Sequence, residues 1–152
     1  MPNDPAKDTD ELDLANVDFH SHWARDVLRY ADTDRQGHVN NAVFATFLES
    51  GRVAILYNPK RPLAPKGASF VIARLVLDFR TEIHWPNEVA IGTTVTRLGN
   101  SSVTFGQGIF VNDVCAAVAE TIIVLMDETT RKSRPLPIET RNELTKWLGR
   151  KN

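Results

Sequence analysis

Residues 41–57 constrain the fold of this chain most, because they have the period of a helix and are apolar around most of its circumference. The apolar side chains recur at the 3.6-residue spacing of one helical face and then spread beyond it. Four polar residues interrupt this surface: Thr46, Glu49, Ser50 and Arg52. A helix with so little polar surface must be covered by another element. Asn58-Pro59 is expected to end it.

The rest of the chain supplies a sheet that can cover this helix. Four segments after the helix are typical of strands: 70–80, 89–98 and 102–111 alternate in the manner of a sheet, and 114–127 is a long run of small and β-branched residues. A strand over 23–30 is expected before the helix, and a short amphipathic helix over 138–148 after the last strand. Turn residues separate the four segments at hairpin spacing, so the pairing should be mostly antiparallel. These patterns predict an α+β fold, in which a curled antiparallel sheet of about five strands wraps around one long central helix.

Length, charge and cysteine content exclude several classes of protein. A chain of 152 residues favours a single domain, expected over 19–152 and preceded by a disordered acidic leader over 1–18. The net charge of −1, without a basic cluster, argues against a nucleic-acid partner. No apolar run approaches the ~20 residues that span a bilayer, and the leader lacks the apolar core of a signal peptide. The single cysteine, Cys115, suits the reducing cytoplasm and is expected to be a small core residue.

The segment 29–41 concentrates polar chemistry between the first strand and the helix. It holds two aspartates, a glycine, a histidine and two asparagines: Asp32, Asp34, Gly37, His38, Asn40 and Asn41. A lone carboxylate at a helix entry is usually a cap. Here the following residues are also polar, where a buried helix should already be apolar. This excess predicts a small active site at the junction.

Each of these residues also has a structural interpretation. Asp34 could cap the turn, and Asp32 could be a turn or surface residue. His38 could be a core histidine whose ring nitrogens are hydrogen-bonded. Asn40 is most simply the N-cap of the helix.

The pattern Arg29-Tyr30-x-Asp32-x-Asp34-x-x-Gly37-His38-Val39-Asn40-Asn41, followed by Phe44 and Glu49-x-x-Arg52, resembles a known family. It is similar to the hotdog-fold acyl-CoA thioesterases of the 4-hydroxybenzoyl-CoA thioesterase type. The His38-Val39-Asn40-Asn41 segment, with Leu48-Glu49-Ser50, is also similar to plant acyl-carrier-protein thioesterases. The resemblance covers residues 23–146. It implies a hotdog fold and a homo-oligomer, either a dimer or a dimer of dimers, with active sites at the subunit interface.

The resemblance implies that Asp34 is the catalytic carboxylate of a thioesterase. The substrate would be an acyl-CoA or acyl-carrier-protein thioester, and Asp34 would be either the nucleophile or a general base. His38 is expected to orient Asp34 or a water, and Asn41 to hold the water or the carbonyl. Relatives carry Tyr or His at the Asn41 position, so this chain departs from them in its supporting residues. Glu49 either replaces Asp34 as the carboxylate, as in hotdog enzymes with a different motif, or pairs with Arg52.

Substrate binding needs an apolar surface for the acyl group and basic residues for the coenzyme phosphates. Phe70 is expected to shape the acyl pocket, and the backbone near Ser69-Phe70 of a partner chain to supply a further oxyanion donor. The candidates for the phosphates are Arg97, Arg131, Lys132, Arg134 and the basic loop 60–66, of which Arg97 and Lys132 are ranked first. No metal or cofactor is expected. His20-Ser21-His22 lacks further ligands and is interpreted as surface residues, and no glycine-rich nucleotide motif occurs.

Two other functions remain open on the same fold, because a fold does not fix a chemistry. A hydratase or dehydratase of acyl thioesters would use an Asp/His pair, and this chain has Asp34 and His38, although not at the spacing associated with those enzymes. A non-catalytic acyl-CoA-binding module is the second alternative.

Overall fold

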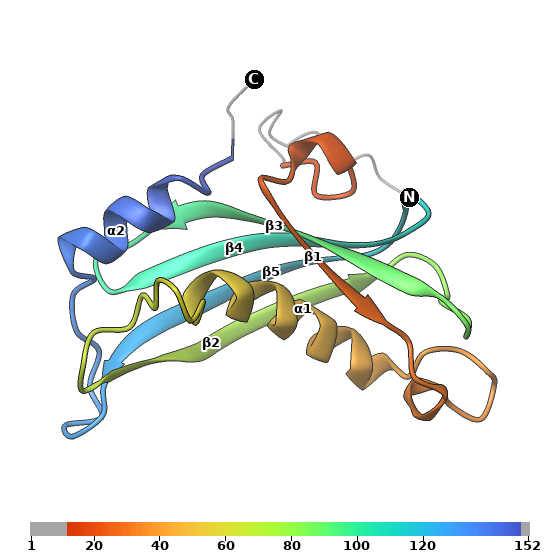
Figure 1. The fold of residues 1–152 in the computed structure, drawn as a ribbon, viewed down its shortest axis with the longest axis horizontal. Helices are drawn as coiled ribbons and strands as arrows, with labels where there is room; N and C mark the ends of the chain where they lie inside the picture. Colours follow the sequence, from red (N-terminus) through yellow and green to blue (C-terminus); the bar gives the residue numbers. More distant parts are fainter. Residues whose placement is uncertain (1–11, 150–152) are drawn as a thin grey trace, which may run out of the picture.

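The computed structural model describes residues 12–149, which form one antiparallel sheet around one long helix (Figure 1). The sheet contains β1 (His22–Val27), β2 (Ala68–Phe79), β3 (Glu88–Leu98), β4 (Ser102–Val111) and β5 (Val114–Asp127). Its order is β1-β3-β4-β5-β2. Helix α1 (Asn41–Leu56) precedes β2, and helix α2 (Ile138–Thr145) follows β5. The structure therefore confirms the expected α+β arrangement. None of the described helices is long and apolar enough to cross a bilayer.

The ends of the elements differ from the predicted ones by a few residues. Strand β1 ends at Val27 rather than at residue 30, because the chain there enters a short 3-10 turn at Tyr30–Asp32. Strand β2 begins at Ala68, two residues before the predicted start at residue 70. Helix α2 ends at Thr145 rather than at residue 148.

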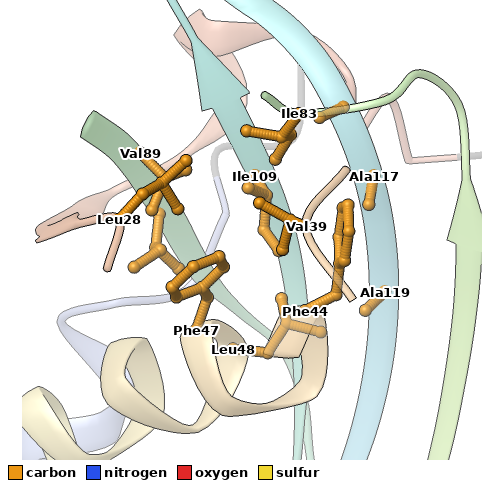
Figure 2. Close-up of a cluster of buried hydrophobic side chains, with 12 residues drawn as sticks. Leu28, Val39, Phe44, Phe47, Leu48, Ile83, Val89, Ile109, Ala117 and Ala119 are labelled. Carbon is orange, nitrogen blue, oxygen red and sulfur yellow. The ribbon is translucent and has the colours of Figure 1, made fainter. Parts of the chain in front are cut away.

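Helix α1 packs closely across one face of the sheet. A Cβ atom placed on Gly51 would lie 2.7 Å from Cγ2 of Ile91 and 2.9 Å from Oγ1 of Thr93, so only glycine permits this approach. Figure 2 shows the cluster around the first half of the helix, where Phe44, Phe47 and Leu48 face strand residues. These three side chains are at most 3 % exposed. The start of α1 is thus held rigidly against the sheet, and this fixes the loop that precedes it.

Strand β2 forms one edge of the sheet and pairs only with β5 among the described residues. It is 12 residues long, and three of its large apolar side chains are at least 38 % exposed: Ile72, Val76 and Phe79. The strand pairing shifts its register at Ile72/Arg74, Val95/Arg97 and Ile109/Phe110, and such irregularities bend a sheet. A long apolar edge of this kind is a surface on which another strand can pair.

The segment that precedes β1 lies on the face of the sheet away from α1. A Cβ atom on Gly106 would collide with the side chain of Leu14, and a Cβ atom on Gly92 with the ring of His20.

The interpretation of His20 and His22 as surface residues is therefore wrong. His20 is 7 % exposed and its Nε2 donates to the Leu14 carbonyl (2.8 Å), while His22 is half-buried. Residues 1–11 of the expected leader lie outside the described residues.

Both of these histidines should make the stability of the protein depend on pH. Burial lowers the pKa of His20 and of His22 below the ordinary value of 6.5. As pH falls below that value, the unfolded chain takes up protons that the folded chain does not, so the free energy of unfolding should decrease. Urea titrations between about pH 7.5 and pH 5.5 would measure this decrease. His22→Asn should flatten the profile, and a level wild-type profile would contradict the expectation.

Candidate active site

Asp34 lies in the loop before α1, and the backbone of this loop fixes its position. Its N–H donates to the His38 carbonyl (2.7 Å), and its own carbonyl accepts from the Gly37 N–H (3.1 Å). Gly37 has a φ of 82°, which is the left-handed conformation that glycine adopts without strain. The sequence therefore closes a tight turn around Asp34.

The carboxylate of Asp34 uses one oxygen for the turn. Oδ1 accepts from the Gln36 N–H (2.8 Å) and from the His38 N–H (3.2 Å). Oδ2 accepts no hydrogen bond from the part of the chain that the structure describes, and the side chain is partly exposed. Asp34 can therefore cap the turn through Oδ1 and still offer Oδ2 for catalysis.

Asp32 has a structural role in the same loop. Its Oδ2 accepts from the Arg29 N–H (2.9 Å), and its Oδ1 lies 3.3 Å from Nη2 of Arg29. Its carbonyl accepts from the Asn40 N–H (2.8 Å), which ties the loop to the start of the helix. Asp32 is 6 % exposed, so it is a turn residue and not a surface residue.

The N-terminus of α1 offers donors close to this loop. Asn40 is the N-cap as predicted, since its Oδ1 accepts from the Ala42 N–H (3.0 Å). Asn41 is exposed, and neither its N–H nor its side chain has a hydrogen-bond partner within residues 12–149. A free N–H at a helix N-terminus carries a partial positive charge that favours an anion.

His38 contacts Asp34 through its backbone, whereas its ring faces another group. Its Nε2 lies 3.3 Å from Oε2 of Glu82, and its ring packs edge-to-face on that of His84, with centroids 5.1 Å apart. The Val39 N–H donates to the Ile83 carbonyl (2.8 Å) and joins the two segments. Glu82 and His84 lie between the predicted strands 70–80 and 89–98, and neither was predicted to lie near His38.

The remaining expected binding residues lie at the other end of the sheet. Phe70 pairs with Leu125 near the end of β5, and its N–H donates to the hydroxyl of Tyr57 (3.0 Å). Arg97 is near the end of β3, and the carbonyl of Lys132 accepts from the Asp127 N–H (2.9 Å). In Figure 1 this end is opposite the loop that enters α1. One chain therefore brings together Asp34, His38 and Asn41 but separates them from Phe70, Arg97 and Lys132.

Arg52 does not form the expected ion pair with Glu49. Its Nη1 instead donates to Oε1 of Gln107 (3.2 Å) and to Oγ1 of Thr121 (3.4 Å), and the residue is 6 % exposed. Burial lowers the pKa of Arg52, against the opposing effect of the nearby Glu49 charge. Glu49 is exposed, and its carboxylate forms no ion pair with Arg52.

Exposed aromatic side chains border the Asp34 loop. Tyr30 is 74 % and Trp85 is 47 % exposed, and their rings pack edge-to-face with centroids 5.4 Å apart. Phe79, at the end of β2, makes a similar contact with Phe44 in the first turn of α1, at 5.1 Å. Aromatic pairs thus lie both beside the Asp34 loop and between α1 and the open edge of the sheet.

The chain belongs to the thioesterase-like superfamily, whose sequence model matches residues 28–148. Curated protein sequences give no significant match. Many solved structures have the same fold, and several of them are named as thioesterases. The fold is therefore the hotdog fold that the sequence resemblance implied.

Three of these structures illustrate the similarity. A protein from Pseudomonas aeruginosa strain PAO1 is 21 % identical over 87 % of this chain and 94 % of its own, with a TM-score of 0.80. A predicted thioesterase from Bacillus stearothermophilus is 27 % identical over 84 % and 97 % of the two chains, with a TM-score of 0.73. A thioesterase from Thermus thermophilus, complexed with coenzyme A and Zn, is 28 % identical over 82 % and 98 %, with a TM-score of 0.72.

Proposed function

We propose that this protein hydrolyses acyl-CoA thioesters to the free acid and coenzyme A, with Asp34 as the catalytic carboxylate. The observation that carries the proposal concerns hydrogen bonding within residues 12–149: Oδ2 of Asp34 has no partner there, and neither has the N–H of Asn41, where the Asp34 loop enters α1. Membership of the thioesterase-like superfamily supports the reaction. The relative from Thermus thermophilus that is complexed with coenzyme A supports this substrate over an acyl-carrier protein. The single cysteine, Cys115, fits a cytoplasmic location.

The chemistry of a thioester matches this small set of groups. A thiol leaving group has a pKa of about 8.5, so it needs little help from a general acid. The reaction requires a group that attacks the carbonyl or activates water, and donors for the oxyanion that develops. Asp34 supplies the first, either as the nucleophile that forms a mixed anhydride or as a general base. The Asn41 N–H and the dipole of α1 supply the second.

The supporting residues have narrower roles in this proposal. His38 positions the Asp34 carboxylate through its backbone N–H rather than through its ring. The exposed amide of Asn41 holds the attacking water or the carbonyl oxygen. Because the His38 ring faces Glu82, the structure offers no Asp/His side-chain pair of the kind that a hydratase would use within residues 12–149.

The active site is completed by a second copy of the chain. We infer a homodimer in which the open edges of two β2 strands pair antiparallel, since this edge is long and apolar. A twofold axis there places the Ala68–Phe70 end of one strand beside the Phe79 end of the other. Phe79 contacts the first turn of α1, so Phe70 of one subunit approaches the Asp34 loop of the other. Arg97 and Lys132 belong to the same end as Phe70 and are then available for the coenzyme phosphates.

Introducing lysines at Ile72 and Val76 should separate the subunits and abolish most of the activity. Lysine on an edge strand opposes strand pairing, and the exposure of both side chains leaves the fold of one chain intact. We expect a monomer by analytical ultracentrifugation and a loss of at least about tenfold in kcat/KM with Asp34 unchanged. Val114→Lys is the matched control, because Val114 is 60 % exposed at the start of β5, on a strand that pairs on both sides. A monomeric double variant with wild-type kcat/KM would overturn the interface proposal.

A thiol-release assay over short, long and aromatic acyl-CoA substrates tests the proposed reaction. Hydrolysis frees the thiol, whereas hydration of an enoyl-CoA leaves the thioester intact. Release of coenzyme A from at least one substrate supports the thioesterase. Hydration without thiol release, or tight acyl-CoA binding without turnover of any substrate, would refute it.

A further inference from the structure

Three side chains next to the Asp34 loop form a compact group that the proposed hydrolysis does not use. Nε2 of His38 lies 3.3 Å and Nε2 of His84 lies 3.5 Å from the same oxygen, Oε2 of Glu82. One ligand atom from each of the three residues lies within 4.8 Å of the others. Two imidazoles and a carboxylate that converge in this way are a common donor set for zinc.

The separations match those around a tetrahedral ion. Zinc binds imidazole nitrogen and carboxylate oxygen at about 2.0–2.1 Å, which places two ligands of a tetrahedron about 3.3–3.4 Å apart. The His38–Glu82 and His84–Glu82 separations already have this value within about 0.2 Å. The donor nitrogens of His38 and His84 lie within 4.8 Å of each other, and the His84 side chain is 59 % exposed, so its rotation is the adjustment that an ion requires.

The backbone holds these ligands on two joined segments. His38 and His84 are paired in an antiparallel bridge, and the Val39 N–H donates to the Ile83 carbonyl (2.8 Å). Val39 and Ile83 are each 2 % exposed and lie in the cluster of Figure 2. Glu82 and His84 flank Ile83 in an extended segment, so their side chains project away from the core on one side. The backbone therefore holds the three donor residues next to one another before any ion binds.

We propose that His38, Glu82 and His84 bind one divalent transition-metal ion of the zinc class, with a coordination position open to solvent. Imidazole donors favour Zn²⁺, Ni²⁺ and Cu²⁺ over Mg²⁺ and Ca²⁺, which prefer oxygen ligands. The His38 backbone also holds the Asp34 carboxylate through its N–H (3.2 Å). An ion at this site therefore fixes the loop that carries Asp34. The proposal does not depend on the hydrolytic reaction, because it concerns the ligands alone.

Titration of the metal-free, untagged full chain with Zn²⁺ tests the site by calorimetry. We expect one Zn²⁺ per chain at micromolar concentrations, and binding weaker by roughly tenfold or more in both Glu82→Gln and His84→Ala. Glu88→Gln is the matched control, since Glu88 is exposed and pairs with Arg25 (2.6 Å) outside the cluster. His22→Asn controls for the loss of a histidine elsewhere.

Co²⁺ in place of Zn²⁺ supplies a second readout that activity does not influence. Wild-type protein should give the intense visible absorption of four-coordinate Co²⁺, and His84→Ala should lose it. The absence of saturable Zn²⁺ binding to the wild type, or unchanged affinity in either Glu82→Gln or His84→Ala, would overturn the site. Thioesterase activity without zinc binding would contradict the metal site and leave the proposed function intact. Zinc binding without thioesterase activity would contradict the proposed function and leave the metal site intact.

Discussion

Asp34→Asn should lower kcat for acyl-CoA hydrolysis by at least about a hundredfold while the protein stays folded. The amide oxygen of asparagine can still accept from the N–H groups of Gln36 and His38, so the turn is retained. What is lost is the negative oxygen that attacks the carbonyl or takes the proton of water. A hundredfold loss corresponds to about 2.7 kcal/mol of transition-state stabilisation. Thiol release under saturating substrate, together with circular dichroism, measures both effects.

Asp32→Asn is the control in the same loop. Its carboxylate bonds to the Arg29 N–H and side chain and is 6 % exposed, so its loss should reduce stability and change kcat far less than the loss of Asp34. Asp34→Ala removes the turn hydrogen bonds as well, and should add a stability loss of about 1 kcal/mol to the loss of activity. Wild-type kcat in folded Asp34→Asn would refute the role of Asp34.

Periodicity predicted the fold because both elements that build it have strong and different periods. The strands β3, β4 and β5 are each ten or more residues long, and the predicted ends of β4 and β5 agree with the structure. Helix α1 is apolar on nearly every side, which required a sheet to cover it. Several other ends differ by a few residues, including the C-terminal end of α2. At the end of β1 and the start of β2 the boundary is set by a short 3-10 turn and by a hydrogen-bonded turn, which the period of a strand does not indicate.

Local sequence indicated the junction before α1 as the candidate site, but it did not indicate which distant residues lie beside this junction. The polar excess near Asp34 is visible in one segment, and the N-cap role of Asn40 follows from its position. Glu82 and His84 join His38 only through a bridge between segments more than forty residues apart. Such a bridge depends on how the chain packs, and no local pattern reports it.

Contacts between distant segments also explain why the predictions for the buried residues Arg52 and His20 were wrong. Arg52 and Glu49 are correctly spaced for a helical pair, yet Arg52 turns to Gln107, which is 55 residues away. His20 is buried because Gly92 on the neighbouring strand leaves room for its ring. In each case a distant residue supplies the space or the hydrogen bond, so spacing within one element gives the wrong partner.

Gly51→Ala should destabilise the protein by about 2 kcal/mol, although alanine is the better helix former. The added Cβ would lie 2.7 Å from Ile91 Cγ2, 2.8 Å from Gln107 Nε2 and 2.9 Å from Thr93 Oγ1. Ile91 and Thr93 are β-branched and stiff, and Gln107 is fixed by hydrogen bonds to the Leu48 carbonyl and to Thr93 (3.0 Å each). None of these neighbours can move freely, so the helix itself must shift from the sheet.

The expected size follows from two opposing effects. Replacing an interior helical glycine by alanine gains about 1 kcal/mol, whereas overpacking a core costs about 1–3 kcal/mol and the strained Gln107 hydrogen bonds add about 1 kcal/mol. Urea unfolding measures the net loss, with Ser50→Ala as the exposed control within the same helix. In a Thr93→Ala background the cost of Gly51→Ala should shrink, because one of the three contacts is gone. If Gly51→Ala left the stability unchanged, α1 would not be held against the sheet at Gly51. The conclusion that the packing of α1 fixes the position of the Asp34 loop would then be wrong.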